Sequence, residues 1–341
     1  MAVEYQLSDR QNKDLLERML MMRRFEETVA ATAEDHFFGH YHLYIGQEAT
    51  GAAVIEALGT DDLILTTHRN HGHIIGRGAD PGPTLAEILG RADGFNGGRG
   101  GTLHLTSRDQ GFLSTSAVVG GGIGLAVGAG YALKRAAGTA ISVAFFGDGA
   151  LEEGTAYESL NLASLWSLPV LFVCENNSLG APGASAGEYP SSVNAAKDLI
   201  DIPRSVGIAA QSVDGADAGA VYAIAATAVA AIRAGQGPAF IEAKTVRWPG
   251  SRPIWPELAT GITNLAAATD GALISGQHAA WINEHDPVLA RVRCLIEDNI
   301  LLPAEIDEID RRVIGTMEAA KSMALASPLP EPESALEGVF T

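Results

Sequence analysis

Apolar residues in the middle of the chain form short continuous runs that alternate with amphipathic segments. The runs occupy residues 140–147, 169–175, 208–213 and 239–246. Such runs are typical of strands buried on both faces of a sheet. Apolar side chains at helical spacing lie between them, in residues 153–167 and 217–234. Strands that alternate with helices predict an α/β fold with a doubly wound parallel sheet.

Helical patterns flank this centre on both sides. Ser8 and Gln11 match a capping box and predict a helix with apolar positions from Leu15 onward. Pro303 starts another predicted helix near the C-terminus. Between these ends, residues 39–101 contain clustered histidines and glycines and are expected to form mostly loops. We therefore predict an N-terminal helical extension (1–38), an α/β domain (39–270) and a C-terminal helical extension with an acidic tail (271–341).

Charge and composition narrow the functional classes. The 341 residues include 23 Lys and Arg against 41 Asp and Glu, which gives a net charge of −18. So acidic a chain repels phosphate backbones and anionic lipid, and we expect neither nucleic acid nor a membrane as partner. The sequence has 2 cysteines and no apolar leader or long apolar run. We therefore expect a cytoplasmic protein.

Polar residues follow two predicted strands at the point where each ends. Gly147-Asp148-Gly149 follows the first run, and Asn176-Asn177 follows the second. One strand–helix–strand crossover separates them, so both groups lie on one edge of the sheet and can converge. A carboxylate and an amide oxygen suit Mg²⁺, and glycines let the main chain approach a phosphate. The sequence therefore predicts a magnesium and phosphate site here.

Other interpretations of these glycines remain open. A dinucleotide site would need a third glycine and no acid inside the loop, and a purely structural turn is also possible. The run Gly120–Gly124 fits close helix packing or cofactor contact equally well. The glycines at 97–101, like those at 120–124 and 147–149, are expected where main chain approaches a cofactor.

A histidine cluster also permits several interpretations. His68, His71 and His73 lie close together, with His40 and His42 upstream. They could bind zinc, be ordinary loop residues, or contact a cofactor or substrate. Arg69 lies within this cluster, and its guanidinium suits a phosphate.

The longer motifs point to a family. Gly147-Asp-Gly-Ala-Leu-Glu-Glu-Gly154 followed by Cys174-Glu-Asn-Asn177 resembles the α subunit of thiamine-diphosphate-dependent 2-oxo acid dehydrogenase decarboxylase components, including pyruvate and acetoin dehydrogenases. Further matches are Tyr44-Ile-Gly-Gln-Glu-Ala49, His68-Arg-Asn-His-Gly72 and Gly100-Gly-Thr-Leu-His104. The resemblance runs from about residue 8 to residue 330, nearly the whole chain.

The resemblance implies a site built around thiamine diphosphate and Mg²⁺. The implied metal ligands are Asp148, Asn177 and the main-chain carbonyl of Leu179. The implied cofactor-binding residues are Arg69, Ala117, Val119, Gly147, Asp148, Gly149, Ala150, Asn177, Leu179 and Ser251. The implied catalytic residues are His42, His68 and His71. Ser251 stands where family members commonly carry a loop histidine.

The resemblance also implies partners. Family enzymes need a pyrimidine-binding half, and this chain has room only for the diphosphate-binding half, so a β subunit in an α2β2 assembly is expected. The small-molecule substrate would be a 2-oxo acid or an acetoin-like compound, with acyl transfer to a lipoyl acyltransferase. An alternative is a two-chain carboligase or transketolase-like enzyme that uses an aldehyde acceptor. A non-catalytic scaffold is disfavoured because Asp148 and Asn177 are both present.

Overall fold

The computed structural model contains one sheet of six parallel strands in the order β2-β1-β3-β4-β6-β5. The strands are β1 (Leu63–Thr67), β2 (Phe112–Ser116), β3 (Ser142–Gly147), β4 (Val170–Asn176), β5 (Ala209–Asp214) and β6 (Ala239–Lys244). The structure describes residues 5–36, 39, 41–177, 194–248, 262–276 and 278–337, with only the main chain for Glu34. The four strands predicted in the centre of the sequence are confirmed as β3 to β6.

The helices of the described residues surround this sheet. The α-helices are α1 (Asp9–Asp35), α2 (Glu48–Glu56), α3 (His71–Gly76), α4 (Pro81–Ile88), α5 (Gly121–Ala136), α6 (Gly154–Leu165), α8 (Asp201–Ser205), α9 (Ala218–Arg233), α10 (Ala279–Glu284), α11 (Pro287–Glu297) and α12 (Pro303–Ala326). The 3-10 helices are η1 (Arg108–Gln110), η2 (Asp148–Glu152), η4 (Leu265–Ala268), η5 (Gly271–Leu273) and η6 (Pro332–Leu336). Within the described ranges, no helix is long and apolar enough to cross a membrane.

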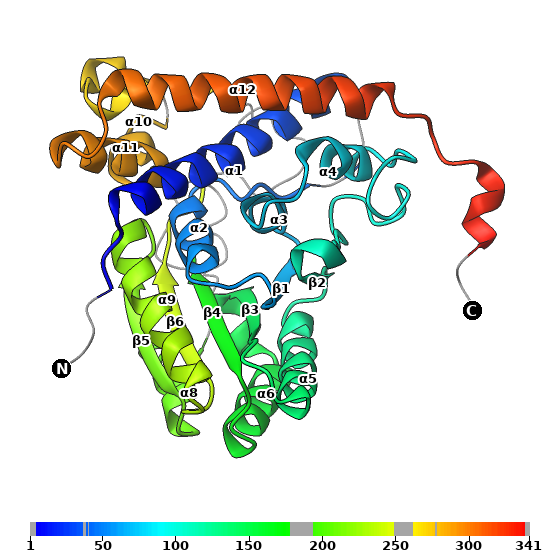
Figure 1. Ribbon diagram of the computed structural model, residues 1–341, viewed down its shortest axis with the longest axis vertical. Coiled ribbons are helices and arrows are strands. Elements are labelled where there is room, and N and C mark those ends of the chain that lie inside the picture. The colour runs from blue at the N-terminus through cyan, green and yellow to red at the C-terminus, as the bar shows by residue number, and fades with distance from the viewer. Residues whose placement is uncertain are drawn as a thin grey trace.

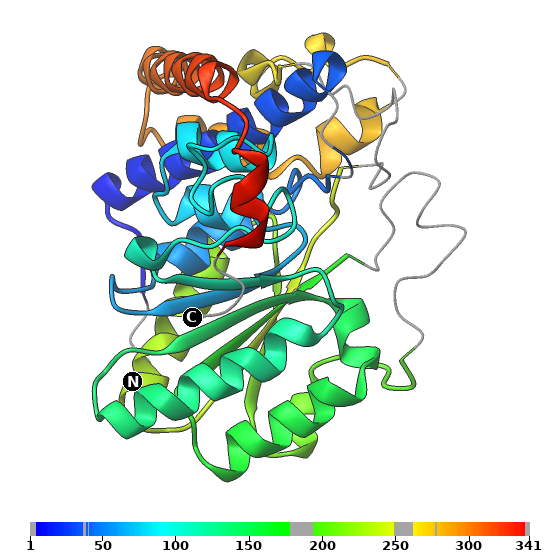
Figure 2. The same cartoon turned by 90° about the vertical axis from the view of Figure 1, so that its right-hand side faces the viewer.

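Helices cover both faces of the sheet, as expected for a doubly wound fold (Figure 1). On one face, α5, α6 and α8 contribute to a core cluster with the strand residues Phe146 and Phe172. On the other face, a larger cluster joins Val143 and Leu171 to α1, α2, α9 and α12. Figure 2 shows α5 and α6 below the sheet and α1 and α12 above it. The predicted fold class is therefore confirmed.

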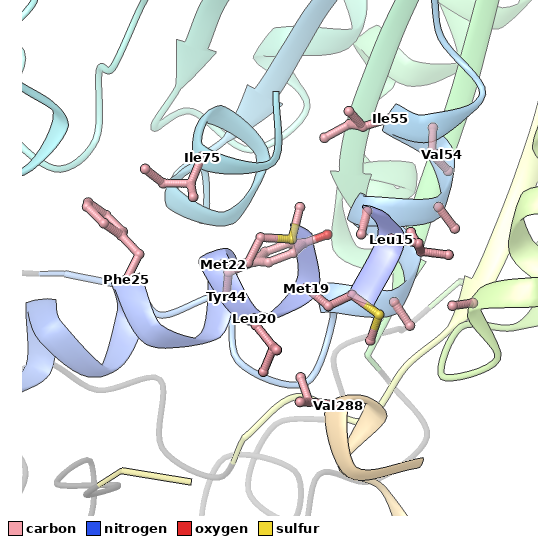
Figure 3. Packing of buried hydrophobic residues seen from close by; sticks show 14 of the residues in the cluster. Leu15, Met19, Leu20, Met22, Phe25, Tyr44, Val54, Ile55, Ile75 and Val288 are labelled. Carbon is pink, nitrogen blue, oxygen red and sulfur yellow. The ribbon is translucent and has the colours of Figure 1, made fainter. Parts of the chain in front are cut away.

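Helix α1 is part of this shared core. Its start is fixed by the predicted capping box, because Ser8 accepts a hydrogen bond from the N–H of Gln11 and Gln11 accepts one from the N–H of Ser8. Leu15, Met19, Leu20, Met22 and Phe25 are buried, and Figure 3 shows them against α2 and α3. The helical extensions thus pack on the helices that cover one face of the sheet, and the domain boundaries stay a prediction.

Strands β1 and β2 are not predicted by the apolar pattern. β1 lies inside the segment expected to form loops, and both strands have 5 residues. A short apolar run such as Leu63–Thr67 shows no decisive periodicity. β2 lies at the edge of the sheet and exposes Leu113, so it lacks the continuous burial of the central strands. The carboxyl ends of these two strands lie at the same end of the sheet as those of β3 and β4, where the candidate site residues follow the strands.

The glycine-rich loop at residues 97–101 binds a carboxylate of the protein itself, and the expected cofactor contact stays a prediction. The fully buried carboxylate of Glu87 accepts hydrogen bonds from the N–H groups of Asn96 (2.8 Å), Gly98 (2.9 Å) and Gly100 (2.6 Å). Gly98 has φ +75°, and a Cβ there would lie 2.5 Å from the main chain of Gly90. The glycine-rich loop therefore wraps a protein carboxylate.

We predict that Glu87→Gln lowers the free energy of unfolding by about 3 kcal/mol, because the new amide would face N–H donors inside the core. The measurement is chemical denaturation of the purified protein. Glu318→Gln, at an exposed position of α12, is the matched control and should change stability little. An equal stability for the two variants would contradict the role assigned to Glu87.

Candidate active site

Two polar residues meet where neighbouring strands β3 and β4 end. Asp148 follows β3, and Asn177 follows β4. The main-chain N–H of Asn177 donates a hydrogen bond of 3.0 Å to Oδ1 of Asp148. Asp148 is buried, with only 2% of its surface exposed. The predicted convergence of these residues across one crossover is therefore confirmed.

The amide of Asn177 is held in a fixed orientation. Its Nδ2 donates to the carbonyl of Glu175 (3.1 Å), and its Oδ1 accepts from the hydroxyl of Thr245 (3.0 Å) after β6. An amide oxygen has two lone pairs, so Oδ1 can still accept a second interaction. Leu179 and Ser251 lie outside the described residues, and their implied roles stay predictions.

Two arginines lie at the same edge of the sheet. Arg69 follows β1, and its Nη1 donates 2.6 Å to the carbonyl of Leu43. Arg247 follows β6, and its Nη1 is buried with no hydrogen-bond partner among the described residues. Burial and the charge of Arg247 lower the pKa of Arg69. Burial also lowers the pKa of Arg247, while Asp148 raises it.

Two positively charged side chains at one edge of the sheet favour the binding of an anion. An arginine side chain stays charged in proteins. The lowered pKa of each arginine therefore means that its positive charge is destabilised, by burial in both cases and by the second arginine in the case of Arg69. A bound anion would relieve both effects by hydrogen bonding to the guanidinium groups. Arg247 was not among the residues predicted from the sequence. Its position directly after the fourth predicted strand is the signal that could have found it.

His42 and His68 form a pair beside the arginines. Their ring centroids are 4.7 Å apart in an edge-to-face arrangement. Burial lowers the pKa of His68 to about 3, with further contributions from the positive charges of Arg69, His42 and Arg247. The His68 imidazole is therefore neutral at physiological pH and offers one donor and one acceptor nitrogen.

His71 lies in a different environment. It is fully buried. Its Nδ1 lies 3.0 Å from Oε2 of Glu26, and its Nε2 lies 2.7 Å from the hydroxyl of Thr102. Both ring nitrogens are thus engaged inside the protein, so in this structure neither is open to a bound molecule. The geometry favours a positioning role over the catalytic role that the resemblance implied.

The remaining implied contacts among the described residues lie at the same edge of the sheet. Ala117 and Val119 follow β2 and are exposed. Gly149 and Ala150 lie in η2, which leads into α6. A Cβ at Gly147 would meet nothing within 4 Å, so this side of the loop is open. Main-chain N–H groups at the start of a helix suit a phosphate.

Two alternatives raised by the sequence can be compared with the structure. Gly120 has φ +75°, and a Cβ there would lie 3.1 Å from Cβ of Glu153, so this glycine permits close packing of α5 on α6. No group of three or more His, Cys, Asp or Glu side chains that could hold a metal occurs among the described residues. His40 lies outside them. The zinc interpretation therefore gains no support from the part of the chain described.

The sequence matches the family described as "Dehydrogenase E1 component" over residues 17–251, which include Asp148, Asn177 and both arginines. The chain belongs to this family. The resemblance inferred from the sequence motifs is thereby confirmed.

Relatives in the E1 family extend the match over nearly the whole chain. The α subunit of acetoin:2,6-dichlorophenolindophenol oxidoreductase of Bacillus subtilis is 34% identical, over 96% of this chain and 92% of the relative. The α subunit of the pyruvate dehydrogenase E1 component of Rhizobium meliloti is 32% identical, over 92% of this chain and 85% of the relative. The α subunit of the pyruvate dehydrogenase E1 component of Zymomonas mobilis is 40% identical, over 70% of this chain and 67% of the relative.

The environment of His68 predicts a loss of stability in acid. The unfolded imidazole binds a proton below about pH 6.5, whereas the folded one does so only near pH 3. Stability should therefore fall by up to about 1.4 kcal/mol per pH unit as pH drops through this window.

We predict that His68→Gln makes stability less dependent on pH between 6.5 and 4, as measured by denaturation at several pH values. His285→Gln, at a half-exposed histidine after α10, serves as control. If the free energy of unfolding depends on pH equally in both variants and in the unchanged protein, the environment assigned to His68 is wrong.

Proposed function

We propose that this E1 family member is the α subunit of a two-subunit, thiamine-diphosphate-dependent enzyme that cleaves a 2-oxo acid or an acetoin-like substrate. The observation that carries this proposal is the contact of Asp148 with Asn177 beside two buried guanidinium groups. The relatives, by name, act as acetoin oxidoreductase and as pyruvate dehydrogenase subunits. Both names belong to enzymes of the dehydrogenase type.

The residues present fit a diphosphate with its metal ion. Asp148, Asn177 and the carbonyl of Leu179 would hold Mg²⁺, which prefers oxygen ligands of this kind. The buried Nη1 of Arg247, which has no hydrogen-bond partner among the described residues, and the guanidinium of Arg69 would bind phosphate oxygens. The main chain at Gly147, Gly149 and Ala150 would approach the diphosphate, and that at Ala117 and Val119 would contact the aminopyrimidine.

The chemistry of cleavage would be divided between cofactor and protein. Thiamine diphosphate, when bound, supplies the nucleophilic carbon and the electron sink for carbon–carbon cleavage. The chain supplies His42 and His68, whose half-buried imidazoles could hydrogen-bond a substrate oxygen. Because His68 is neutral, it would stabilise developing charge as a hydrogen-bond donor and not as a cation.

A β subunit would complete the site. The relatives are named as α subunits, and the described residues contain a single parallel sheet. Val118 and Val119 expose 72% and 50% of their surface in the segment that is proposed to contact the aminopyrimidine. Apolar side chains exposed at a site edge are suited to burial by a partner. We infer an α2β2 assembly that passes its acyl group to a lipoyl acyltransferase in the cytoplasm.

We predict that Asp148→Ala weakens Mg²⁺-dependent binding of thiamine diphosphate to the α–β complex by about 100-fold or more, because the only carboxylate among the proposed metal ligands is lost. Isothermal titration calorimetry measures this binding. Asp201→Ala, at an exposed acid of α8, changes the net charge equally and should leave the affinity intact. Unchanged binding of thiamine diphosphate to the Asp148→Ala complex would contradict the assignment of Asp148 as a magnesium ligand.

The purified chain alone should show no turnover, and addition of the β subunit should restore it. The assay follows reduction of 2,6-dichlorophenolindophenol with acetoin or pyruvate as substrate. Products formed with a lipoyl carrier or with an aldehyde then identify the acceptor. Robust activity of the chain alone would overturn the need for a partner.

A further inference from the structure

The carboxylate of Glu26, on α1, contacts two segments of the site at once. It is fully buried. Its Oε1 accepts a hydrogen bond of 2.8 Å from the main-chain N–H of Tyr44, and its Oε2 lies 3.0 Å from Nδ1 of His71. Glu26 itself lies on the helix outside the sheet layer. Its two oxygens nevertheless hold the loop before α2 and the start of α3.

The first contact reaches Arg69 through one peptide group. Leu43 and Tyr44 are consecutive, so the carbonyl of Leu43 and the N–H of Tyr44 belong to the same peptide unit. Arg69 donates 2.6 Å to that carbonyl, while Glu26 accepts from that N–H. The peptide dipole thus lies between a guanidinium and a carboxylate in its favourable direction, which strengthens both hydrogen bonds.

The second contact reaches the main chain beside Arg69. His71 lies two residues after Arg69, and its other nitrogen lies 2.7 Å from the hydroxyl of Thr102. Asn70, between them, donates from Nδ2 to the carbonyls of Thr67 and Thr102, both at 3.1 Å. Arg69 is therefore fixed both at its guanidinium and along its main chain.

Packing keeps the bridging peptide in place. The Tyr44 ring is buried beside Met22 of α1, as Figure 3 shows. A Cβ at Gly72 would lie 2.0 Å from Cδ1 of Tyr44, so only glycine leaves room for this ring. The Tyr44 hydroxyl also hydrogen-bonds Glu175, two residues before Asn177. The peptide has little freedom to move once Glu26 holds its N–H.

We propose that Glu26 is a positioning residue for Arg69, which it orients toward a bound diphosphate through the Leu43–Tyr44 peptide and through His71. This inference rests on the proposed function, in which Arg69 binds the diphosphate. Nothing in the E1 family match itself assigns Glu26 a role.

The direction in which the affinity for an anion changes when Glu26 is replaced distinguishes a positioning role from a purely electrostatic one. Glu26 carries a negative charge near the site, and its charge acts on Arg69. Removal of that charge alone would strengthen the binding of an anion. Loss of orientation would weaken binding, because the guanidinium would no longer be held for its hydrogen bonds to phosphate.

The experiment measures the affinity of the α–β complex for Mg²⁺–thiamine diphosphate and for inorganic pyrophosphate by calorimetry. In Glu26→Gln, a near-isosteric change, the Kd for both should rise about tenfold, the scale of one charge-assisted hydrogen bond. In an Arg69→Lys background, the same change should raise Kd less than about threefold, because the ammonium is a compact point charge without the planar fork whose orientation the peptide controls.

Glu27→Gln is the matched control. Glu27 is the next residue of α1 and is also buried, but it accepts hydrogen bonds from Thr263 and Arg24 and not from the two segments that hold Arg69. This variant should leave both affinities unchanged even if stability drops. If Glu26→Gln fails to fold, Thr102→Val tests the His71 path alone and should raise both Kd values about threefold.

The outcomes separate the two proposals. Tighter or unchanged binding in Glu26→Gln, or an equal loss in the Arg69→Lys background, would overturn the positioning role. An unchanged Kd in Arg69→Lys itself would instead overturn the assignment of Arg69 to the diphosphate, and with it the proposed function of this residue.

Discussion

The register of β3 against β4 is the constraint on which the candidate site depends. Gly147 pairs with Glu175, which brings Asp148, directly after β3, close to Asn176 and Asn177 at the end of β4. All residues of β4 are buried, so a slip by one residue would exchange the side chains that face the two cores. Such a slip would also change the contact in which Asp148 accepts a hydrogen bond from the main-chain N–H of Asn177. Core packing thus fixes the geometry of a polar site that itself contributes little apolar contact.

Buried positive charge is the second organising feature. The chain carries a net charge of −18, yet Arg69 and Arg247 meet at the edge of the sheet where β1 and β6 end. Buried cations are costly unless they are paired. Part of this cost is offset for Arg69, because it donates a hydrogen bond to the carbonyl of Leu43 and because the negative charges of Glu26 and Glu175 stabilise its positive charge. The front of the site keeps its capacity for an anion, while the surface of the protein stays acidic.

The sequence allowed the central strands and the metal-binding motif to be predicted, because both depend on local patterns. Continuous apolar runs mark strands buried on both faces, and Asp148 and Asn177 follow such runs directly. The contacts of Glu26 could not be predicted in this way, since they join α1 to residues from Tyr44 to Thr102 that only the tertiary fold brings together. Arg247 could have been found, because it too follows a predicted strand. The glycines at 97–101 show why a glycine-rich loop alone does not identify a cofactor site, because main-chain N–H groups of this loop bind the carboxylate of Glu87.

Histidines of one short motif illustrate how environment decides role. His68 and His71 are separated by two residues, but His68 follows β1 while His71 begins α3. The strand end places His68 beside two arginines and His42, where a proton is disfavoured and the neutral ring can still face a bound molecule. The helix start turns His71 into the core, where Glu26 and Thr102 occupy both nitrogens. A motif can therefore identify the family, but the partners of each ring nitrogen determine which histidine could act on a substrate and which one holds the site in place.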